Sequence, residues 1–397
     1  MSKLPKGWEL VQFDKVCDIR DGTHDSPKYI ESGIPFITSK HLTDNGIDFT
    51  ETNYISKENH IEFSKRSKVD NGDILFGMIG TIGKPIIVNT DFEFSIKNIA
   101  LLKLSCNELL SNIYVLNLLK SNIITKQFSK LSNGGVQSFI ALGMIRKLKI
   151  PLPPLEEQKK IADILSIVDK KIAFVEENIN ATEELKKGLM QKLLTEGIGH
   201  TDFKDSELGR IPESWEVVQQ SDVATFYNGR AYKLSEWEES GTPVIRLQNL
   251  TGTGTDYYYS TLQLPEHQYC ENGDLLYMWS ATFGPVWWKG ERAIYHYHIW
   301  KITTEENKLD RIFLFYLLDQ ITIRMKKQSH GSTMIHVTKG GMEKLKIQLP
   351  PLEEQKQIAE ILSTVDNKLE NLKEKKLFFE ELKKGLMQKL LTGEVRV

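Results

Sequence analysis

Residues 77–85 form a glycine-rich stretch, which is the first pattern in the chain that could bind a phosphate group. A nucleotide-binding phosphate loop needs a glycine where Met78 stands and a Ser or Thr where Pro85 stands, so this pattern fails. His296 and His298 alternate as on a strand and could bind a metal, but such pairs are more often surface or core residues. The sequence also lacks the motifs of amino-methyltransferases, serine hydrolases, zinc proteases and calcium sites. We therefore expect neither a catalytic residue nor a metal site in this chain.

Composition restricts the function further. Hydrophobic residues make up 40% and charged residues 26%, which is ordinary for a soluble globular protein. No apolar run approaches the 18 residues of a membrane span, and the first residues lack a signal core, so we expect a cytoplasmic protein. Three cysteines without a C-x-x-C pair argue against a disulfide framework and a zinc site. A net charge of −2 argues against a simple electrostatic DNA binder, although residues 101–150 and 301–350 are locally basic.

The elements that must position any site are duplicated. Residues 152–195 align without a gap onto residues 349–392, and 30 of the 44 positions are identical. Both copies begin with Leu-Pro-Pro-Leu-Glu-Glu-Gln and end with Leu-Lys-Lys-Gly-Leu-Met-Gln-Lys-Leu-Leu-Thr. Weaker landmarks repeat upstream, where Trp8 matches Trp215 and Asn71-Gly72-Asp73 matches Asn272-Gly273-Asp274. The chain therefore carries two equivalent units, whose loops differ in length.

Each unit is expected to be a strand-rich globular part followed by a long helix. Short β-branched or aromatic runs bounded by Gly, Asn and Asp predict strands. A basic amphipathic helix follows in each unit, at residues 108–129 and 309–327. The Pro-Pro pairs force an extended entry and then permit a second, longer helix.

The long helices carry a coiled-coil seam. Apolar residues follow one another at alternating spacings of four and three, which is the pattern of a coiled coil. One helix cannot bury such a seam alone, whereas two in one chain can pair with each other, and a pseudo-twofold axis would make that pairing antiparallel. A plain dimerisation coil is the alternative. The seam residues are Ile161, Leu165, Val168, Ile172, Val175, Ile358, Leu362, Val365, Leu369 and Leu372.

This combination resembles the DNA-specificity subunit of type I restriction–modification enzymes. The resemblance rests on two divergent regions that begin near Pro-x-x-Trp, end at Leu-Pro-Pro-Leu-Glu-Glu-Gln and precede near-identical helices. It implies an α+β protein of two tandem units whose long helices pair as an antiparallel coiled coil. The implied boundaries are residues 1–153 and 213–350 for two target-recognition domains, 154–197 and 351–394 for two spacer helices, and 198–212 for a linker.

The resemblance also implies the function and the partners. Each globular domain would read one half of a bipartite, asymmetric site in double-stranded DNA, and the helices would set the spacing. The helices would also dock two methyltransferase subunits, and two restriction subunits would join that core. The chain itself would bind no cofactor, because S-adenosylmethionine, ATP and magnesium would serve the partner subunits. The alternatives are a coiled-coil scaffold that joins partners without reading DNA, and an enzyme with an unrecognised site.

Base reading needs donors and acceptors that reach a groove, such as Arg or Lys for guanine and Asn or Gln for adenine. Glycine-containing loops with such side chains occur early in each unit and after each basic helix. The lysines of the basic helices are expected to meet phosphates rather than bases. The DNA-binding candidates are Arg20, Thr23, His24, Lys40, His41, Lys126, Lys130, Asn133, Gly134, Gln137, Asn228, Arg230, Tyr232, Arg246, Gln248, Asn249, Lys326, Lys327, His330, Ser332 and Thr333.

Overall fold

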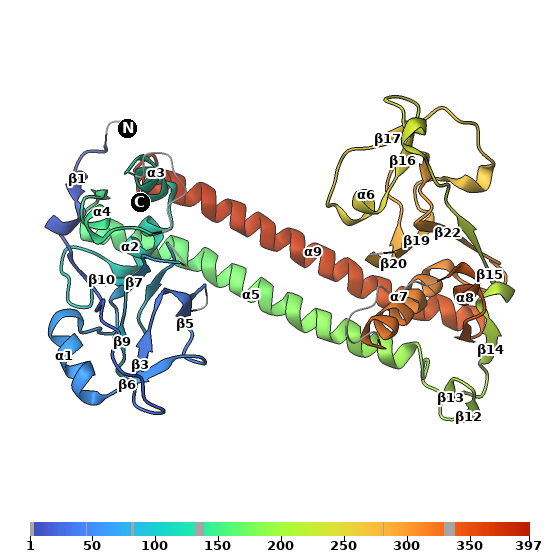
Figure 1. The fold of residues 1–397 in the computed structure, drawn as a ribbon, viewed down its shortest axis with the longest axis horizontal. Coiled ribbons are helices and arrows are strands. Elements are labelled where there is room, and N and C mark those ends of the chain that lie inside the picture. Colours follow the sequence, from blue (N-terminus) through green and yellow to red (C-terminus); the bar gives the residue numbers. More distant parts are fainter. Residues whose placement is uncertain (1–3, 45, 81–82, 132–138, 281, 329–337) are drawn as a thin grey trace. The chain divides into compact units, whose positions relative to one another are not determined.

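The computed structural model describes the whole chain except residues 1–3, 45, 81–82, 132–138, 281 and 329–337 (Figure 1). The chain divides into two compact units. Unit 1 comprises Met1–Glu176 together with Glu374–Val397, and unit 2 comprises Glu177–Lys373. Both units combine strands with helices, which confirms the predicted α+β class.

Unit 1 is built around a four-stranded antiparallel sheet. Its order is β2 (Asp18–Asp21), β10 (Ile99–Lys103), β7 (Ile74–Gly77) and β8 (Pro85–Ile87). A second sheet holds β6 (Asn53–Ile55), β3 (Ile34–Ile37) and β9 (Ser95–Ile96), and β3 runs parallel to β9. Two smaller pairs are β1 (Glu9–Gln12) with β11 (Lys149–Leu152), and β4 (Leu42–Thr43) with β5 (Gly46–Ile47). Helices α1 (Lys57–Ser67) and α4 (Leu142–Arg146) also belong to this unit.

Unit 2 repeats this plan with different lengths. Its four-stranded sheet has the order β15 (Ala224–Asn228), β22 (Ile299–Thr304), β19 (Leu275–Ser280) and β20 (Thr282–Trp287). Its second sheet holds β17 (Tyr258–Ser260), β16 (Thr242–Ile245), β21 (Ala293–Tyr295) and β18 (Tyr269–Cys270), and β16 runs parallel to β21. The pairs are β14 (Glu216–Gln219) with β23 (Lys346–Leu349), and β12 (Phe203–Ser206) with β13 (Gly209–Pro212). The short helices are α6 (Leu247–Thr251) and α8 (Lys339–Glu343).

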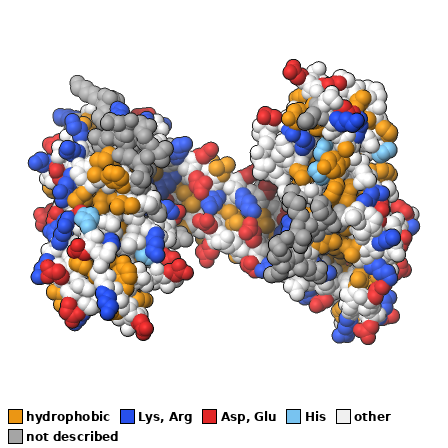
Figure 2. Space-filling view, in the orientation of Figure 1, with side chains coloured by type: hydrophobic (Ala, Val, Ile, Leu, Met, Phe, Trp, Pro, Cys, Tyr) orange, Lys and Arg blue, Asp and Glu red, His pale blue; other side chains and the backbone are white. Residues whose placement is uncertain are grey.

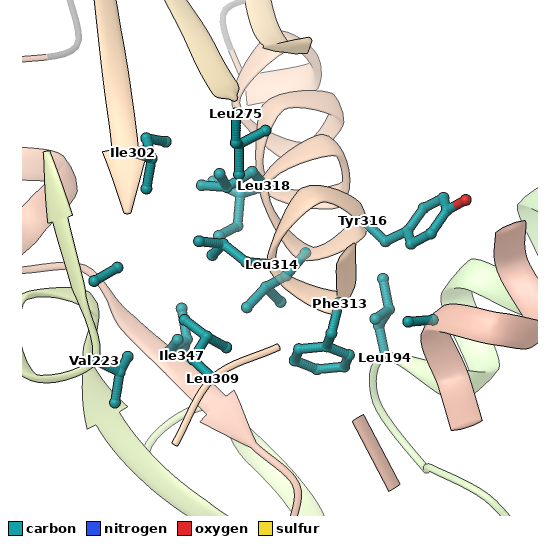
Figure 3. Packing of buried hydrophobic residues seen from close by; sticks show 14 of the residues in the cluster. Leu194, Val223, Leu275, Ile302, Leu309, Phe313, Leu314, Tyr316, Leu318 and Ile347 are labelled. Carbon is teal, nitrogen blue, oxygen red and sulfur yellow. The ribbon is translucent and has the colours of Figure 1, made fainter. Parts of the chain in front are cut away.

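The basic helices differ between the units. In unit 2 the predicted helix is the continuous α7 (Arg311–Gln328), and Figure 3 shows its residues Leu314 and Leu318 turned toward Leu275 and Ile302 of the sheet. In unit 1 the prediction of one helix is wrong, because α2 (Asn112–Leu119) and α3 (Asn122–Leu131) are separate. The break lies at Ser121, whose hydroxyl donates to the Leu118 carbonyl at 2.6 Å and so competes with the helical bonding.

The long helices α5 (Leu155–Leu193) and α9 (Leu352–Leu390) pair within each unit. In unit 1, Asp169 of α5 pairs with Lys383 of α9, and Glu176 of α5 pairs with Lys376 of α9. The residue numbers therefore increase along α5 while they decrease along α9. In unit 2, Glu183 pairs with Lys373, and Lys186 with Asp366. Both sets of ion pairs have the antiparallel sense that the repeat predicts.

The predicted seam is the buried stripe of these helices. Its most buried members are Ile161, Leu165, Ile358 and Leu362, whose exposed fraction is 0%. Val168, Val175 and Leu369 are also buried, whereas Ile172, Val365 and Leu372 are half-buried. The seam is therefore deepest where each helix begins and also packs against a globular part.

A tryptophan fixes the start of each long helix. The Trp8 indole donates to Glu157 at 3.0 Å in unit 1, and the Trp215 indole donates to Glu354 at 2.9 Å in unit 2. The same carboxylates hold the segment that follows the other long helix. Arg396 donates twice to Glu157, whereas the Ile198 amide and the His200 ring contact Glu354 at 2.9 and 2.8 Å.

Candidate nucleic-acid interface

One end of the four-stranded sheet in unit 2 gathers several of the predicted residues. Strand β15 ends at Asn228, which lies opposite Trp300 near the start of β22. At the end of β19, the Trp279 amide donates to the His298 carbonyl at 3.2 Å, and its indole donates to the Tyr297 carbonyl at 2.7 Å. Three separate chain segments therefore meet at this end of the sheet.

The parallel pair of β16 and β21 brings a fourth segment to the same place. Parallel strands end at a common edge, so Arg246 after β16 lies near His296 after β21. The His296 amide donates to the Ile245 carbonyl at 2.9 Å, and the Tyr297 amide donates to the Arg230 carbonyl at 3.1 Å. The loop after β15 and the turn of α6 are thus held together by backbone hydrogen bonds.

Aromatic rings stack against each other at this edge. Trp237 stacks on Tyr232 with ring centroids 4.7 Å apart and on Tyr258 at 4.5 Å. The His296 ring lies 6.2 Å from Trp237, nearly parallel to it. We call Tyr232, Trp237, Tyr258 and His296 the aromatic cluster. Figure 2 shows histidine, hydrophobic and basic side chains next to each other on the upper part of unit 2.

Two arginines lie over this cluster. The Arg230 guanidinium is 4.5 Å from the centre of the Tyr232 ring and pairs with Glu236. The Arg246 guanidinium is 4.1 Å from the Tyr258 ring, and no carboxylate among the described residues forms an ion pair with it. Within the described residues, Nη1 of Arg230 and Nε of Arg246 are buried without a hydrogen-bond partner. Unpaired donors of this kind are costly unless a ligand completes them.

His296 is neutral near pH 7. Burial, together with the neighbouring His298 and Arg246, lowers the pKa of its ring to about 4. The ring therefore offers one donor and one acceptor rather than a second positive charge.

The corresponding end of the sheet in unit 1 has the same backbone plan. Thr23 bridges to Lys97 in the parallel sense, as Arg230 bridges to His296 in unit 2. The turn after β3 is capped by a bond from the Thr38 amide to the His41 ring, as the Arg246 amide bonds the Asn249 side chain after β16, both at 2.9 Å. The two early loops that were predicted separately are therefore structural equivalents.

Two glycines make these close approaches possible. A Cβ at Gly22 would lie 2.3 Å from the Ile96 carbonyl oxygen, and one at Gly229 would lie 2.3 Å from that of His296. Only glycine lets the loop cross the edge at this distance.

The chemistry of the unit 1 edge differs from that of unit 2. The His24 ring lies between Asn98 at 2.6 Å and Asp21 at 2.9 Å, and Lys97 donates to Ser26. Asn98 has a φ of 54°, an uncommon conformation for a residue other than glycine, and its carbonyl accepts from Ser39 at 3.4 Å. Small polar groups thus replace the aromatic rings and arginines of unit 2.

The remaining candidates are spread more widely. Arg20 pairs with Asp18 on β2, Lys40 is exposed, and His41 is buried where it caps its turn. Lys126 and Lys130 lie exposed on α3, Lys326 of α7 donates to the Phe283 carbonyl at 3.1 Å, and the next residue is Lys327. Asn133, Gly134, Gln137, His330, Ser332 and Thr333 lie outside the described residues.

The sequence analysis missed several residues at these edges, namely Lys97, Asn98, Trp237 and Tyr297. It considered His296 and His298 only as metal ligands. Within the described ranges, no group of three or more His, Cys, Asp or Glu side chains could hold a metal ion. No described helix is long and apolar enough to cross a membrane.

Comparison with known proteins gives the class. Residues 5–184 and 212–378 match the family described as "Type I restriction modification DNA specificity domain". The chain is 33% identical to the putative type I restriction enzyme MjaX specificity subunit of Methanocaldococcus jannaschii, over 100% of this chain and 96% of that protein. It is 30% identical to the MjaVIII specificity subunit of the same organism, over 100% and 94%.

Solved structures share the fold. The S subunit of a type I restriction–modification system from M. genitalium aligns with a TM-score of 0.59 at 15% identity, over 98% of this chain and 97% of that one. A chain from a structure of type I R-M complex assembly aligns with a TM-score of 0.65 at 19% identity, over 100% of both chains. The chain therefore belongs to the type I restriction–modification DNA-specificity family, and its role is that of a non-catalytic specificity subunit.

Proposed function

We propose that each unit reads one half of a bipartite, asymmetric DNA site through the sheet edge described above. The carrying observation is that both units have the same backbone plan at this edge but different side chains on it. Unit 1 presents Thr23, His24, Lys97 and Asn98, and unit 2 presents arginines and the aromatic cluster. Equivalent scaffolds with different donors and acceptors suit two unlike half-sites. In this proposal residues 1–153 and 213–350 are the target-recognition domains.

The long helices would set the spacing and dock two methyltransferase subunits. Each is continuous over 39 residues, about 60 Å at 1.5 Å per residue, and contributes to both units. Away from the seam they expose large apolar side chains, including Ile167, Leu185 and Leu377. Where exposed apolar side chains form a contiguous patch, that patch is typical of a partner surface. Two restriction subunits would join this core in the cytoplasm, and the partners would use S-adenosylmethionine, ATP and magnesium.

Single-molecule sequencing of methylated adenines, in cells that carry the chain and its methyltransferase partner, tests the reading of two half-sites. We expect a motif of two unlike halves separated by unspecified bases. Replacing Lys97 by Ala should relax one half, and replacing the equivalent His296 by Ala should relax the other. Lys65→Ala, which removes an exposed lysine paired with Glu62, is the control and should leave the motif unchanged.

A complex that assembles but methylates without sequence preference would favour the scaffold alternative. A continuous motif, or one half that responds to both substitutions, would contradict the division of reading between the units.

A further inference from the structure

Arg246 differs from two other arginines of unit 2, Arg230 and Arg292, that lie within 4.5 Å of a tyrosine ring. Arg230 over Tyr232 is paired with Glu236, and Arg292 over Tyr269 is paired with Glu266 and Glu271. Arg246 is half-buried, lies 4.1 Å from the Tyr258 ring and forms no ion pair with a described carboxylate. Among the described residues, no carboxylate therefore compensates its positive charge through a direct ion pair.

The Arg246 guanidinium donates hydrogen bonds to a neutral acceptor. With its amide oxygen turned toward the arginine, Gln248 accepts from Nη2 at 2.5 Å and from Nη1 at 3.3 Å. The Asp256 carbonyl lies at the edge of hydrogen-bond range, 3.5 Å from Nη2. Displacing a neutral amide oxygen costs less than displacing a carboxylate, because the amide carries no full negative charge to attract the guanidinium.

The stacking restricts how the guanidinium can turn. The guanidinium carbon lies over the Tyr258 ring, which itself stacks on Trp237, and this contact limits how far the group can move. A planar fork held in this way loses little further freedom when it binds two acceptors at once. Guanine presents two such acceptors, O6 and N7, side by side in the major groove.

We propose that Arg246 reads a guanine in the half-site of unit 2, with guanine O6 and N7 replacing the Gln248 oxygen at its fork. This inference rests on the proposed function and adds the identity of a base to it. At the equivalent position of unit 1 stands Thr38, which carries no charge. The half-site of unit 1 therefore has no arginine-read guanine at the matching position.

The test is the methylation motif of the complete complex, with variants in the chain. Arg246→Ala should relax one guanine position in one half of the motif and reduce the preference for guanine there about 5- to 150-fold. Arg246→Lys should keep part of that preference, because lysine can make one of the two bonds, and it guards against a folding defect of the alanine variant. Gln248→Ala should retain the guanine.

Arg292→Ala is the matched control. It removes an arginine that also lies 4.1 Å from a tyrosine ring, but one whose charge is neutralised by two glutamates. The motif should not change in this variant.

Three results would overturn the assignment. The first is that Arg246→Ala reduces methylation at all sites equally and leaves the motif unchanged. The second is that Arg246→Ala relaxes an A·T position of the motif. The third is that Gln248→Ala, and not Arg246→Ala, loses the preference for guanine. The first of them would mark a phosphate contact. A wild-type complex without a bipartite motif would instead refute the proposed function itself.

Discussion

At the scale of single residues, the most informative side chains are the two glutamates that begin the long helices. Glu157 and Glu354 stand at equivalent repeat positions, and each accepts a tryptophan indole. The next residue, Gln158 or Gln355, is fully buried. Its side chain donates to the carbonyl of the first proline of the Pro-Pro pair and accepts from the amide of Ser111 or Asp310, just before α2 or α7. The identity of the repeated motif therefore reflects hydrogen bonds that lock each helix to its globular part.

Glu157→Gln should destabilise unit 1 by about 1–3 kcal/mol at pH 7, since it weakens charge-assisted bonds to a buried group. Burial alone would raise the pKa of Glu157, but hydrogen bonds from Arg396 and Trp8 hold it below its ordinary value. A lowered carboxyl pKa stabilises the fold above the unfolded value, near 4.5, and that contribution disappears as the pH falls through the folded pKa. The difference between wild type and variant should therefore shrink below about pH 4.

Denaturant unfolding, with hydrogen exchange in unit 1 as the signal, measures this difference in stability at each pH. Glu156→Gln is the control, because Glu156 is exposed and its one ion pair among the described residues is with Lys159, so its effect should stay within about 0.5 kcal/mol. An equal effect of both variants, or a difference that persists at acidic pH, would contradict the role given to Glu157.

The sequence marked these residues without showing their contact. Trp8 and Trp215 are landmarks of the repeat, as are the two glutamates, but 149 and 139 residues separate the partners. Hydrogen bonds over such distances leave no local signal. The candidate interface was only partly predictable for the same reason. Arg230 and Arg246 lie in recognisable loops, whereas His296 comes near them through the parallel pairing of β16 and β21, which leaves no local signal.

At the scale of elements, the long helices were predictable because a seam is a local, periodic signal. The strands were predictable as a class, but their order was not, since sheet pairing depends on contacts between distant segments. The helix predicted at residues 108–129 was wrong in one detail that a local signal could not settle. Ser121 and Asn122 are both compatible with a helix, and the sequence does not show that the Ser121 hydroxyl bonds back to the Leu118 carbonyl at the break.

The seam makes a quantitative prediction for α5. Leu165→Ala should destabilise unit 1 by about 3 kcal/mol, because Leu165 is fully buried in the core and its loss leaves a cavity. Ile167→Ala, two residues away and 55% exposed, should cost less than about 1 kcal/mol. Urea unfolding of the two variants measures the contrast, and equal losses would mean that the stripe at Leu165 is not the one that packs.

At the scale of the whole molecule, the chain is interleaved rather than cut into consecutive halves. The last residues of the sequence belong to unit 1, where Leu391 is fully buried and Arg396 pairs with Glu157. In unit 2 the segment after α5 takes the matching place, with Ile198 and His200 on Glu354. Each unit is therefore completed by residues that follow the helix of the other repeat.

This arrangement predicts where a C-terminal deletion acts. Removing residues 391–397 should destabilise unit 1, in which Gly393 also lies so close to Pro5 that an added Cβ would be 2.4 Å from its ring. Hydrogen exchange should accelerate in β1 and in the first turns of α5, although these lie more than 200 residues away in sequence. The first turns of α9 belong to unit 2 and should keep their protection.

Arg396→Gln separates the two contributions of the tail, because it removes the charged pair and leaves Leu391 in place. Its effect should be smaller than that of the deletion, since the apolar contact of Leu391 with the unit 1 core remains. Faster exchange in α9 near Glu354 after the deletion, with β1 unaffected, would show that the tail completes the other unit and that the interleaving is wrong.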